Sequence, residues 1–229
     1  MDFFRFPHTP HLAWLASGAP RDDKVLSSQE ASAMLAQEVV IEEKVDGANI
    51  GLSVDEQGNL QAQNRGSYLA REASHPQFKP LFHWLEVRRD SLVDTLFPDL
   101  ILFGEWCYAV HSVRYTKLPD WFLAFDVYDR TRAEFWSAAR RDELVNRLGI
   151  DLVPRLAKGC FDVRGVQRLL GQSQLGDGPA EGLYVRRDDG DRLLARAKLV
   201  RPEFVQSIEE HWSRLAPRAN LLAGGGAWL

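Results

Sequence analysis

One stretch decides the fold of this chain, and it reads Val39-Val40-Ile41-Glu42-Glu43-Lys44-Val45-Asp46-Gly47-Ala48-Asn49. The three β-branched residues at its start predict a strand, and Asp46-Gly47 predicts a tight turn directly after that strand. Lys44 ends the strand, so its amine is held beside the turn, where a ligand can reach it. The pKa of a lysine falls readily on burial or beside other cations, which can make the amine a nucleophile for an α-phosphate or a carbonyl. The same residues also fit a strand end with a solvated lysine.

The composition is that of an ordinary folded protein, because 45% of the 229 residues are hydrophobic and 26% are charged. No run approaches the roughly 18 apolar residues of a membrane span, and the amino terminus lacks a signal-peptide pattern. The two cysteines, Cys107 and Cys160, lack metal-ligand spacing, so we expect reduced thiols in a cytoplasmic protein without membrane contact. The net charge of -4 argues against a broadly basic surface, so any polynucleotide contact is a local patch or salt-sensitive.

The order of apolar patterns and turn residues predicts an α+β fold with largely antiparallel sheets. Strands are expected at 39–43, 49–54, 60–64, 101–103 and 122–128, and in a hairpin of 183–187 with 192–199. Helices are expected at 78–89, 137–148, 162–170 and 202–215. No repeat or low-complexity linker divides the sequence, so we expect a single domain over residues 1–229 with a tail frayed from about Pro217.

Three side chains in or directly after predicted strands fit a nucleotide pocket. Arg65 follows a strand pair that starts at the lysine turn, and its fork suits a phosphate or a ribose oxygen; alone, it also fits a solvated hairpin end. Glu105 follows an apolar strand and can accept a ribose hydroxyl or bind a metal-bound water, or else lie exposed. Phe125 lies in an aromatic-rich strand, where a ring can stack on a purine, although core packing is the more common fate.

A further carboxylate and two cations belong to the predicted hairpin near the carboxyl end. Glu181 directly precedes its first strand. Arg196 and Lys198 alternate on its second strand and therefore share one face. Two cations at that spacing can cradle a phosphate and lower the pKa of a nearby lysine. They equally fit a basic outer face that protects an edge strand against aggregation.

Taken together and in order, these segments resemble the covalent lysyl-nucleotidyltransferases, the superfamily of ATP-dependent DNA and RNA ligases and mRNA capping enzymes. The resemblance covers about residues 38–200 and rests on residues 44–49, Arg65-Gly66, Phe103-Gly104-Glu105, Phe125-Asp126, Glu181-Gly182 and Arg196-Ala197-Lys198. Asn49 favours the RNA ligases that seal nicks in duplex RNA, because the other branches more often carry arginine there. The stretch 103–129, with Tyr108, His111 and Tyr115, and the opening 6–12 also look like bacterial and phage RNA ligases.

The resemblance implies a nucleotidyltransferase fold, unrelated to ATP-grasp, of mainly antiparallel sheets with flanking helices. It implies that Lys44 becomes a lysyl-adenylate and that Mg²⁺ or Mn²⁺ assists, with Glu181 as the metal candidate. The ATP-binding residues it implies are Glu43, Lys44, Arg65, Glu105, Phe125, Glu181, Arg196 and Lys198. In this scheme Lys198 and Arg196 hold the α-phosphate, Arg65 and Glu105 bind the ribose side, and Phe125 stacks on adenine. Lys44, Asn49 and Lys198 are the catalytic residues, and Asn49 acts when strands are joined.

The chain departs from that pattern in two ways. Lysine usually stands where this sequence has Arg196, and few residues follow Lys198, so we expect no separate carboxy-terminal substrate domain. The expected partners are RNA ends or a nicked duplex. An RNA-repair protein is a further expected partner, which can supply the substrate contacts that a carboxy-terminal domain makes in many ligases. Three alternatives stay open: a guanylyltransferase or other nucleotidyltransferase, a nucleotide-dependent RNA-binding module without joining activity, and a protein-modifying nucleotidyltransferase.

Overall fold

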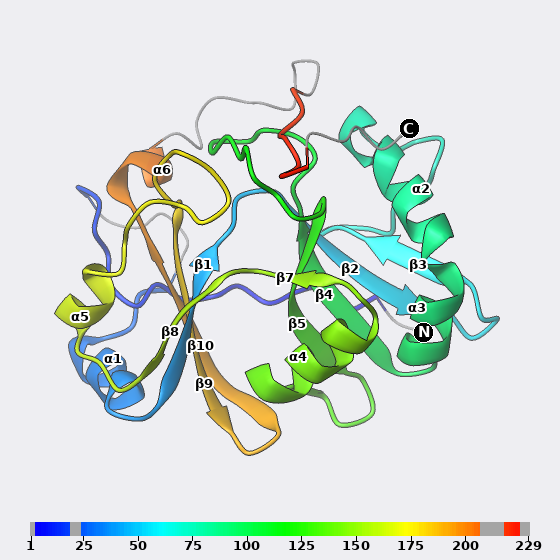
Figure 1. Ribbon diagram of the computed structural model, residues 1–229. Coiled ribbons are helices and arrows are strands. Elements are labelled where there is room, and N and C mark those ends of the chain that lie inside the picture. Colours follow the sequence, from blue (N-terminus) through cyan, green and yellow to red (C-terminus); the bar gives the residue numbers. More distant parts are fainter. Residues whose placement is uncertain (1–2, 19–23, 207–217, 225–229) are drawn as a thin grey trace.

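Two mainly antiparallel sheets standing side by side form the frame of the protein (Figure 1). The computed structural model describes residues 3–18, 24–206 and 218–224. The first sheet has four strands in the order β10-β9-β1-β8. Their bounds are β1 Val39–Lys44, β8 Arg155–Gly159, β9 Gly182–Asp189 and β10 Arg192–Val200.

The second sheet has six strands, of which five follow the order β3-β2-β4-β5-β6 while the sixth, β7, pairs with β5 in parallel. Their bounds are β2 Ala48–Val54, β3 Leu60–Gln63, β4 Leu100–Trp106, β5 Phe122–Asp129, β6 Glu134–Phe135 and β7 Asp151–Leu152. β1 and β2 are consecutive along the chain but belong to different sheets. The lysine turn is therefore the short crossing between the two sheets.

Short helices flank the two sheets (Figure 1). They are α1 Ser28–Leu35, α2 Lys79–Val87, α3 Arg89–Leu96, α4 Ala138–Arg147, α5 Val163–Gln167 and α6 Pro202–Gln206, with a 3₁₀ turn, η1, at Pro76–Phe78. α3 contacts β2, β3 and β4, α4 contacts β5 and β7, and α1 contacts α5 beside the first sheet (Figure 1). Among the described residues, none of these helices is long and apolar enough to cross a membrane.

Each sheet has its own apolar core. The larger core joins the second sheet to α2, α3 and α4, through side chains such as Leu52, Trp84 and Leu102. The smaller one joins the first sheet to α1 and α5 and includes Leu35 and Ile41. Burial of one such leucine or isoleucine contributes about 1.5–3 kcal/mol. The described residues thus form a large core, a smaller core and a third cluster of Phe6, Ile101 and Phe103. Val45 of the lysine turn belongs to the large core.

The predicted α+β class with antiparallel sheets is confirmed, and most strand positions match within a few residues. The expected strand 101–103 is longer, because β4 pairs with β5 through Trp106. The expected helix 78–89 is divided into η1, α2 and α3, since Arg88 between the last two has φ −108° and ψ 6°. The helix that Asp162 caps ends at Gln167 rather than Leu170. The helix from Pro202 is described to Gln206, and its expected continuation lies outside the described residues.

Several elements were not expected from the sequence. α1 was missed, although Ser27 and Glu30 form a capping box at its start, a pattern that the sequence already contains. β6, β7 and β8 were missed because they are short and are defined by distant partners. The expected fraying from Pro217 is wrong for residues 218–224, which pack against residues 107–118. Asn220 within that segment is only 1% exposed.

Candidate active site

The end of β1 brings the amine of Lys44 against a carboxylate from a distant part of the chain. β1 pairs with β9 so that Lys44 lies opposite Gly182, which places Glu181 beside it. The Lys44 Nζ lies 2.7 Å from Oε1 and 2.6 Å from Oε2 of Glu181. Their side chains are 28% and 13% exposed, so the pair is accessible from one side. The lysine on the turn therefore faces a partly open site and not bulk solvent.

The second sheet contributes another carboxylate to the same site. β2 pairs with β4 so that Asn49 lies opposite Glu105. The backbone N–H of Gly47 donates to Glu105 Oε1 at 3.2 Å, which ties this carboxylate to the lysine turn. The predicted site residues Lys44, Asn49, Glu105 and Glu181 are thus brought together from both sheets.

Charges in this site act against the simple expectation for a nucleophilic lysine. Burial by itself lowers the pKa of Lys44, but the charges of Glu181 and Glu105 outweigh it and raise the pKa. Burial also raises the pKa of Glu181, and it raises the pKa of Glu105 to about 7 against the opposing charges of Lys44 and Arg65. The expectation that cations lower the pKa of this lysine is wrong, because the carboxylates of Glu181 and Glu105 are close to it and raise that pKa.

The Asp46-Gly47 turn is held in place by the loop between β4 and β5. The Asp46 N–H donates to the Tyr115 hydroxyl at 2.7 Å. The Asp46 carboxylate accepts from the backbone N–H groups of Ser112 at 2.6 Å and Val113 at 2.9 Å. A Cβ on Gly47 would lie 2.7 Å from the Trp106 carbonyl oxygen, so only glycine fits. Because both ends of the turn are bonded, the position of Lys44 is well defined.

Two predicted ATP-binding residues occupy different environments from one another. The Glu43 carboxylate is 1% exposed and accepts hydrogen bonds from the Ser173 hydroxyl and, at 2.9 Å, from the Gln174 N–H. Burial raises its pKa. Glu43 therefore anchors the loop that leads to Glu181. Arg65 is exposed in the turn after β3, and its positive charge opposes the rise that burial causes in the pKa of Glu105.

The two cations of β10 do not act as a pair in the structure. The guanidinium of Arg196 bonds Asp126 Oδ2 at 2.9 Å and lies over the Phe6 ring at 4.6 Å and the Phe135 ring at 4.1 Å. Lys198, by contrast, is close enough to Glu181 to lower the pKa of that carboxyl. Arg196 is thus committed to Asp126, whereas Lys198 belongs to the lysine site.

β10 is not the free edge strand of the alternative interpretation. The Lys198 N–H donates to the Pro10 carbonyl at 2.9 Å, and the Leu12 N–H donates to the Lys198 carbonyl at 2.7 Å. Residues 10–12 therefore add a parallel neighbour to β10. Phe6, which precedes this segment, packs on the half-buried Phe125, with the two rings edge-on at 5.4 Å.

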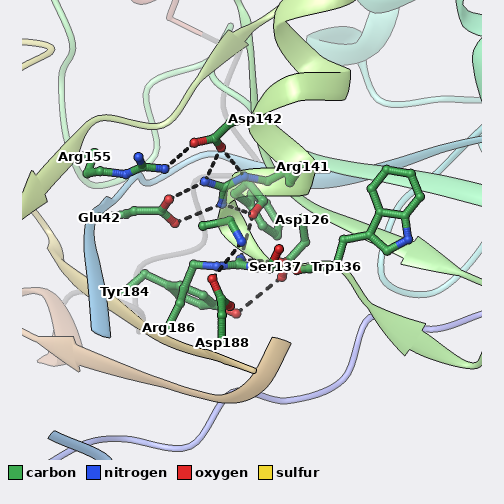
Figure 2. Close-up of polar contacts among 12 residues, drawn as sticks. Glu42, Asp126, Trp136, Ser137, Arg141, Asp142, Arg155, Tyr184, Arg186 and Asp188 are labelled. Carbon is green, nitrogen blue, oxygen red and sulfur yellow. Dashed lines mark hydrogen bonds and ion pairs between the residues drawn. The ribbon is translucent and has the colours of Figure 1, made fainter. Parts of the chain in front are cut away.

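Behind Phe125, buried arginines and carboxylates join the two sheets, and Figure 2 shows this network. Arg141 from α4 bonds both carboxylate oxygens of Glu42 in β1, at 2.5 and 3.2 Å. Arg186 from β9 forms an ion pair with Asp126 in β5. Both arginines also donate to the Phe125 carbonyl, at 2.6 and 2.9 Å. The four charged side chains are at most 1% exposed, and we call them the ionic joint.

Comparison with known proteins identifies the family of the chain. The RNA ligase family model matches residues 37–200, which is most of the chain. The chain belongs to the RNA ligase family. No curated protein matches it.

Solved structures of a Naegleria gruberi RNA ligase share the fold of this family member. A mutant with ATP and Mn is 18% identical with a TM-score of 0.63 over 87% of this chain and 63% of that chain. The ligase with PPi is 19% identical with a TM-score of 0.61, and a mutant with AMP and Mn is 18% identical with a TM-score of 0.60. Each of these two matches covers 90% of this chain and 64% of the other. The chain thus spans less than two thirds of the length of these ligases.

The carboxylates around Lys44 fit a divalent metal ion that is bound together with a nucleotide. Within residues 3–18, 24–206 and 218–224, no three His, Cys, Asp or Glu side chains are grouped to hold a metal by themselves. Mg²⁺ commonly takes one or two carboxylates and completes its shell with substrate phosphates and water. Glu181 and Glu105 supply oxygen ligands of that kind, so the residues fit a metal that arrives with a nucleotide.

Sequence reasoning missed several residues that support the site. Tyr115 entered only through the family resemblance, while Arg141, Arg186 and Ser173 were not singled out. The sequence offers one weak indication of their role, because Arg141 and Arg186 lie at buried positions of α4 and β9, on the faces that pack inward. Their partners lie 99 and 60 residues away, so their role could be found only from the folded chain.

Proposed function

We propose that this chain is an ATP-dependent RNA ligase that stores adenylate on Lys44 and seals a 5′-phosphate to a 3′-hydroxyl. The observation that carries the proposal is the placement of Lys44 on a braced crossing between two sheets, between Glu181 and Glu105, in a chain of the RNA ligase family. A reactive amine at such a crossing can reach a nucleotide that lies between the sheets.

In the first reaction the neutral amine of Lys44 attacks the α-phosphorus of ATP. The N–P bond forms while the bond from the α-phosphorus to the bridging oxygen breaks, and pyrophosphate leaves with that electron pair. The Lys44 ammonium first loses a proton, and Glu181 is the nearest acceptor because its oxygens lie 2.6 and 2.7 Å from Nζ. The raised pKa of Glu181 suits it to hold that proton.

The remaining residues position the nucleotide. Lys198 lies on the Glu181 side and neutralises phosphate charge, whereas Arg196 acts through Asp126 instead of on phosphate directly. Glu105 and Arg65 lie together at the ribose side, and Phe125 offers a ring for adenine. A Mg²⁺ or Mn²⁺ ion bound with ATP at Glu181 and Glu105 would offset negative charge on the phosphates.

In the second stage the adenylate passes from Lys44 to the 5′-phosphate of an RNA end. A 3′-hydroxyl then attacks that phosphate, a phosphodiester bond forms and AMP leaves. Asn49 lies opposite Glu105 at the start of β2, so its amide can orient the RNA end beside the adenylate. The use of ATP is supported by the solved structures, because a Naegleria gruberi RNA ligase with a similar fold was solved with ATP, with AMP and with PPi.

The proposal is tested by covalent labelling. Protein incubated with α-labelled ATP and Mg²⁺ should give a labelled band that survives denaturation, and Lys44→Ala should abolish it. Lys158→Ala is the matched control, because Lys158 is an exposed lysine of the same sheet paired with Glu38. Undiminished labelling of Lys44→Ala would mean that the nucleophile is misassigned. Labelling by GTP in place of ATP would favour a guanylyltransferase.

A further inference from the structure

The loop that braces the lysine turn has no regular structure of its own. Residues 107–121 connect β4 to β5 without a helix or strand. Irregular loops of this length are uncommon in compact domains and usually serve a function. Their backbone polar groups still need partners, because a buried N–H or C=O without one is costly. The position of this loop therefore depends on what its backbone bonds to on either side.

On its inner side the loop bonds the lysine turn. Ser112, Val113 and the Tyr115 hydroxyl together bond the backbone and carboxylate of Asp46. These bonds fix the loop to the turn, but they do not fix the loop to the rest of the fold.

On its outer side the loop is bonded by residues 218–224, which we call the strap. Asn220 is its centre: the Asn220 Oδ1 accepts from the Tyr115 N–H at 2.8 Å. Its Nδ2 donates to the carbonyls of Cys107 at 2.8 Å and Ala109 at 3.2 Å. The amide oxygen and both amide hydrogens of Asn220 therefore form hydrogen bonds with the backbone of loop residues 107–115.

The backbone of the strap adds bonds along the same segment. The Val110 N–H donates to the Arg218 carbonyl at 2.8 Å, and the Leu221 N–H donates to the Tyr115 carbonyl at 3.0 Å. The Ala223 N–H donates to the Leu118 carbonyl at 2.8 Å. Figure 1 shows the strap, in red, beside the green loop that follows β4. Loop residues 107–118 are therefore bonded by the strap on one side and by the lysine turn on the other, while the N–H groups of Thr116 and Lys117 also donate to the Leu175 carbonyl.

We propose that Asn220 is a positioning residue for Lys44, acting through Tyr115 and Asp46. This inference rests on the proposed lysyl-adenylate chemistry. Asn220 holds the backbone of Tyr115, the Tyr115 hydroxyl holds the Asp46 N–H, and Asp46 lies two residues from the reacting amine. Networks of this kind are worth more than their separate bonds, and displacement of a reacting group by about 1 Å can cost roughly 100-fold in rate.

The kinetic signature follows from which elements hold the nucleotide. The proposed adenine and ribose contacts, Phe125 and Arg65, lie in β5 and after β3, and none of the strap bonds reaches them. Loss of the strap contact should therefore slow lysyl-adenylate formation at saturating ATP, while ATP affinity changes little. A residue that merely stabilised the fold would leave the rate of the folded fraction unchanged.

The experiment compares four variants of the full chain by rapid-quench labelling with α-labelled ATP. Asn220→Ala should slow adenylate formation roughly tenfold or more, within the loss expected from misplacement of a reacting group. Leu221→Ala is the matched control, because this strap side chain is 48% exposed, and its rate should equal that of the parent. Tyr115→Phe removes the hydroxyl contact with Asp46 and should show the same signature as Asn220→Ala.

The double variant Asn220→Ala/Tyr115→Phe decides whether the two residues act along one route. If they do, the second substitution should add little to the first, because both remove the same brace. Multiplying effects, or an unchanged rate in Asn220→Ala or in Tyr115→Phe, would overturn the inference. Circular dichroism gives the folded fraction of each variant, and Tyr115→Phe decides the matter if Asn220→Ala does not fold. A parent chain that never labels would instead refute the proposed function.

Discussion

At the residue scale, the protein holds its candidate nucleophile as an ion pair. Lys44 lies between two acidic side chains, and their charges keep its amine protonated more strongly than in a free lysine. An ammonium has no lone pair for attack, so Lys44 must lose a proton before it can act as the proposed nucleophile. In the proposed reaction, a divalent metal held by Glu181 and Glu105 would offset the carboxylate charges that keep the amine protonated.

The pH dependence of adenylation should reflect this ion pair. Because the pKa of Lys44 is raised, its neutral fraction is small near pH 7 and grows as the pH rises. The rate of lysyl-adenylate formation at saturating ATP should therefore rise with pH. Glu105→Gln removes a charge that raises the pKa of Lys44, so this variant should reach a given fraction of its plateau at lower pH. A profile with no acid-side loss in the parent would show that Lys44 enters the reaction already neutral.

Asn49→Ala should separate the two halves of the reaction. If the Asn49 amide serves the joining step, the variant should still form the lysyl-adenylate but seal a nicked RNA duplex poorly. Loss of one positioned polar contact in the transition state typically costs about 10²–10³-fold. Labelling and sealing should be measured on one preparation. Equal losses in both assays would assign Asn49 to the shape of the turn alone.

At the element scale, buried charged contacts connect the two sheets beside the Phe125 carbonyl. The ionic joint links β1 and β9 of the first sheet to β5 and α4 of the second (Figure 2). Buried ion pairs add little net stability over apolar packing, but they are intolerant of misalignment. We therefore interpret the joint as a set of contacts that fixes the relative position of the two sheets on either side of the lysine turn.

Breaking this joint on one side should destabilise the protein strongly. Arg141→Met leaves Glu42 as an unpaired buried charge and should lower the free energy of unfolding by about 3–5 kcal/mol. The double variant Glu42→Met/Arg141→Met should recover most of that loss, because no buried charge remains unpaired. The Phe125 carbonyl keeps Arg186 as a donor in both variants.

Urea unfolding measures these differences, and an exposed arginine provides the control. Arg192→Met removes an ion pair to Asp189 in which the two side chains are 54% and 57% exposed, so it should cost no more than about 1 kcal/mol. A double variant as unstable as Arg141→Met would show that the joint contributes more than mutual neutralisation of its charges.

At the scale of the whole molecule, the chain combines the proposed nucleotide site with a modest net negative charge. The net charge is -4, so attraction to a polynucleotide depends on a few local cations and not on the overall field. The contacts proposed for ATP differ, because they lie in the partly buried site around Lys44 and would be screened less by salt. RNA binding and adenylation should consequently respond differently to ionic strength.

The affinity for nicked RNA should be weak and should have a shallow salt dependence. The slope of log affinity against log salt is about −0.9 per neutralised phosphate, and we expect a slope that corresponds to roughly two to five phosphates. Adenylation of Lys44 should vary much less over the same titration, from low to physiological salt. A slope near ten phosphates would point to a basic face that the net charge conceals.

Local patterns alone were enough to place the lysine turn and most of the strands that carry the site. β-Branched runs, the Asp-Gly turn and the helix caps depend on neighbouring residues, so they can be read along the chain. The membership of Lys44 and Glu181 in one site was a prediction from matching ordered motifs to a family. The pairing itself depends on the β1–β9 register, which joins residues 137 positions apart.

Only the tertiary structure decided which charged residues are free to meet a ligand. Glu43 is enclosed by Ser173 and Gln174, Arg196 is held by Asp126, and the carboxyl-terminal strap is ordered although its composition predicts fraying. These outcomes depend on burial and on partners from distant segments. Desolvation and Coulomb energy are set by three-dimensional distance, which a linear pattern does not contain. For the same reason the raised pKa of Lys44 became visible only once Glu181 and Glu105 were placed around it.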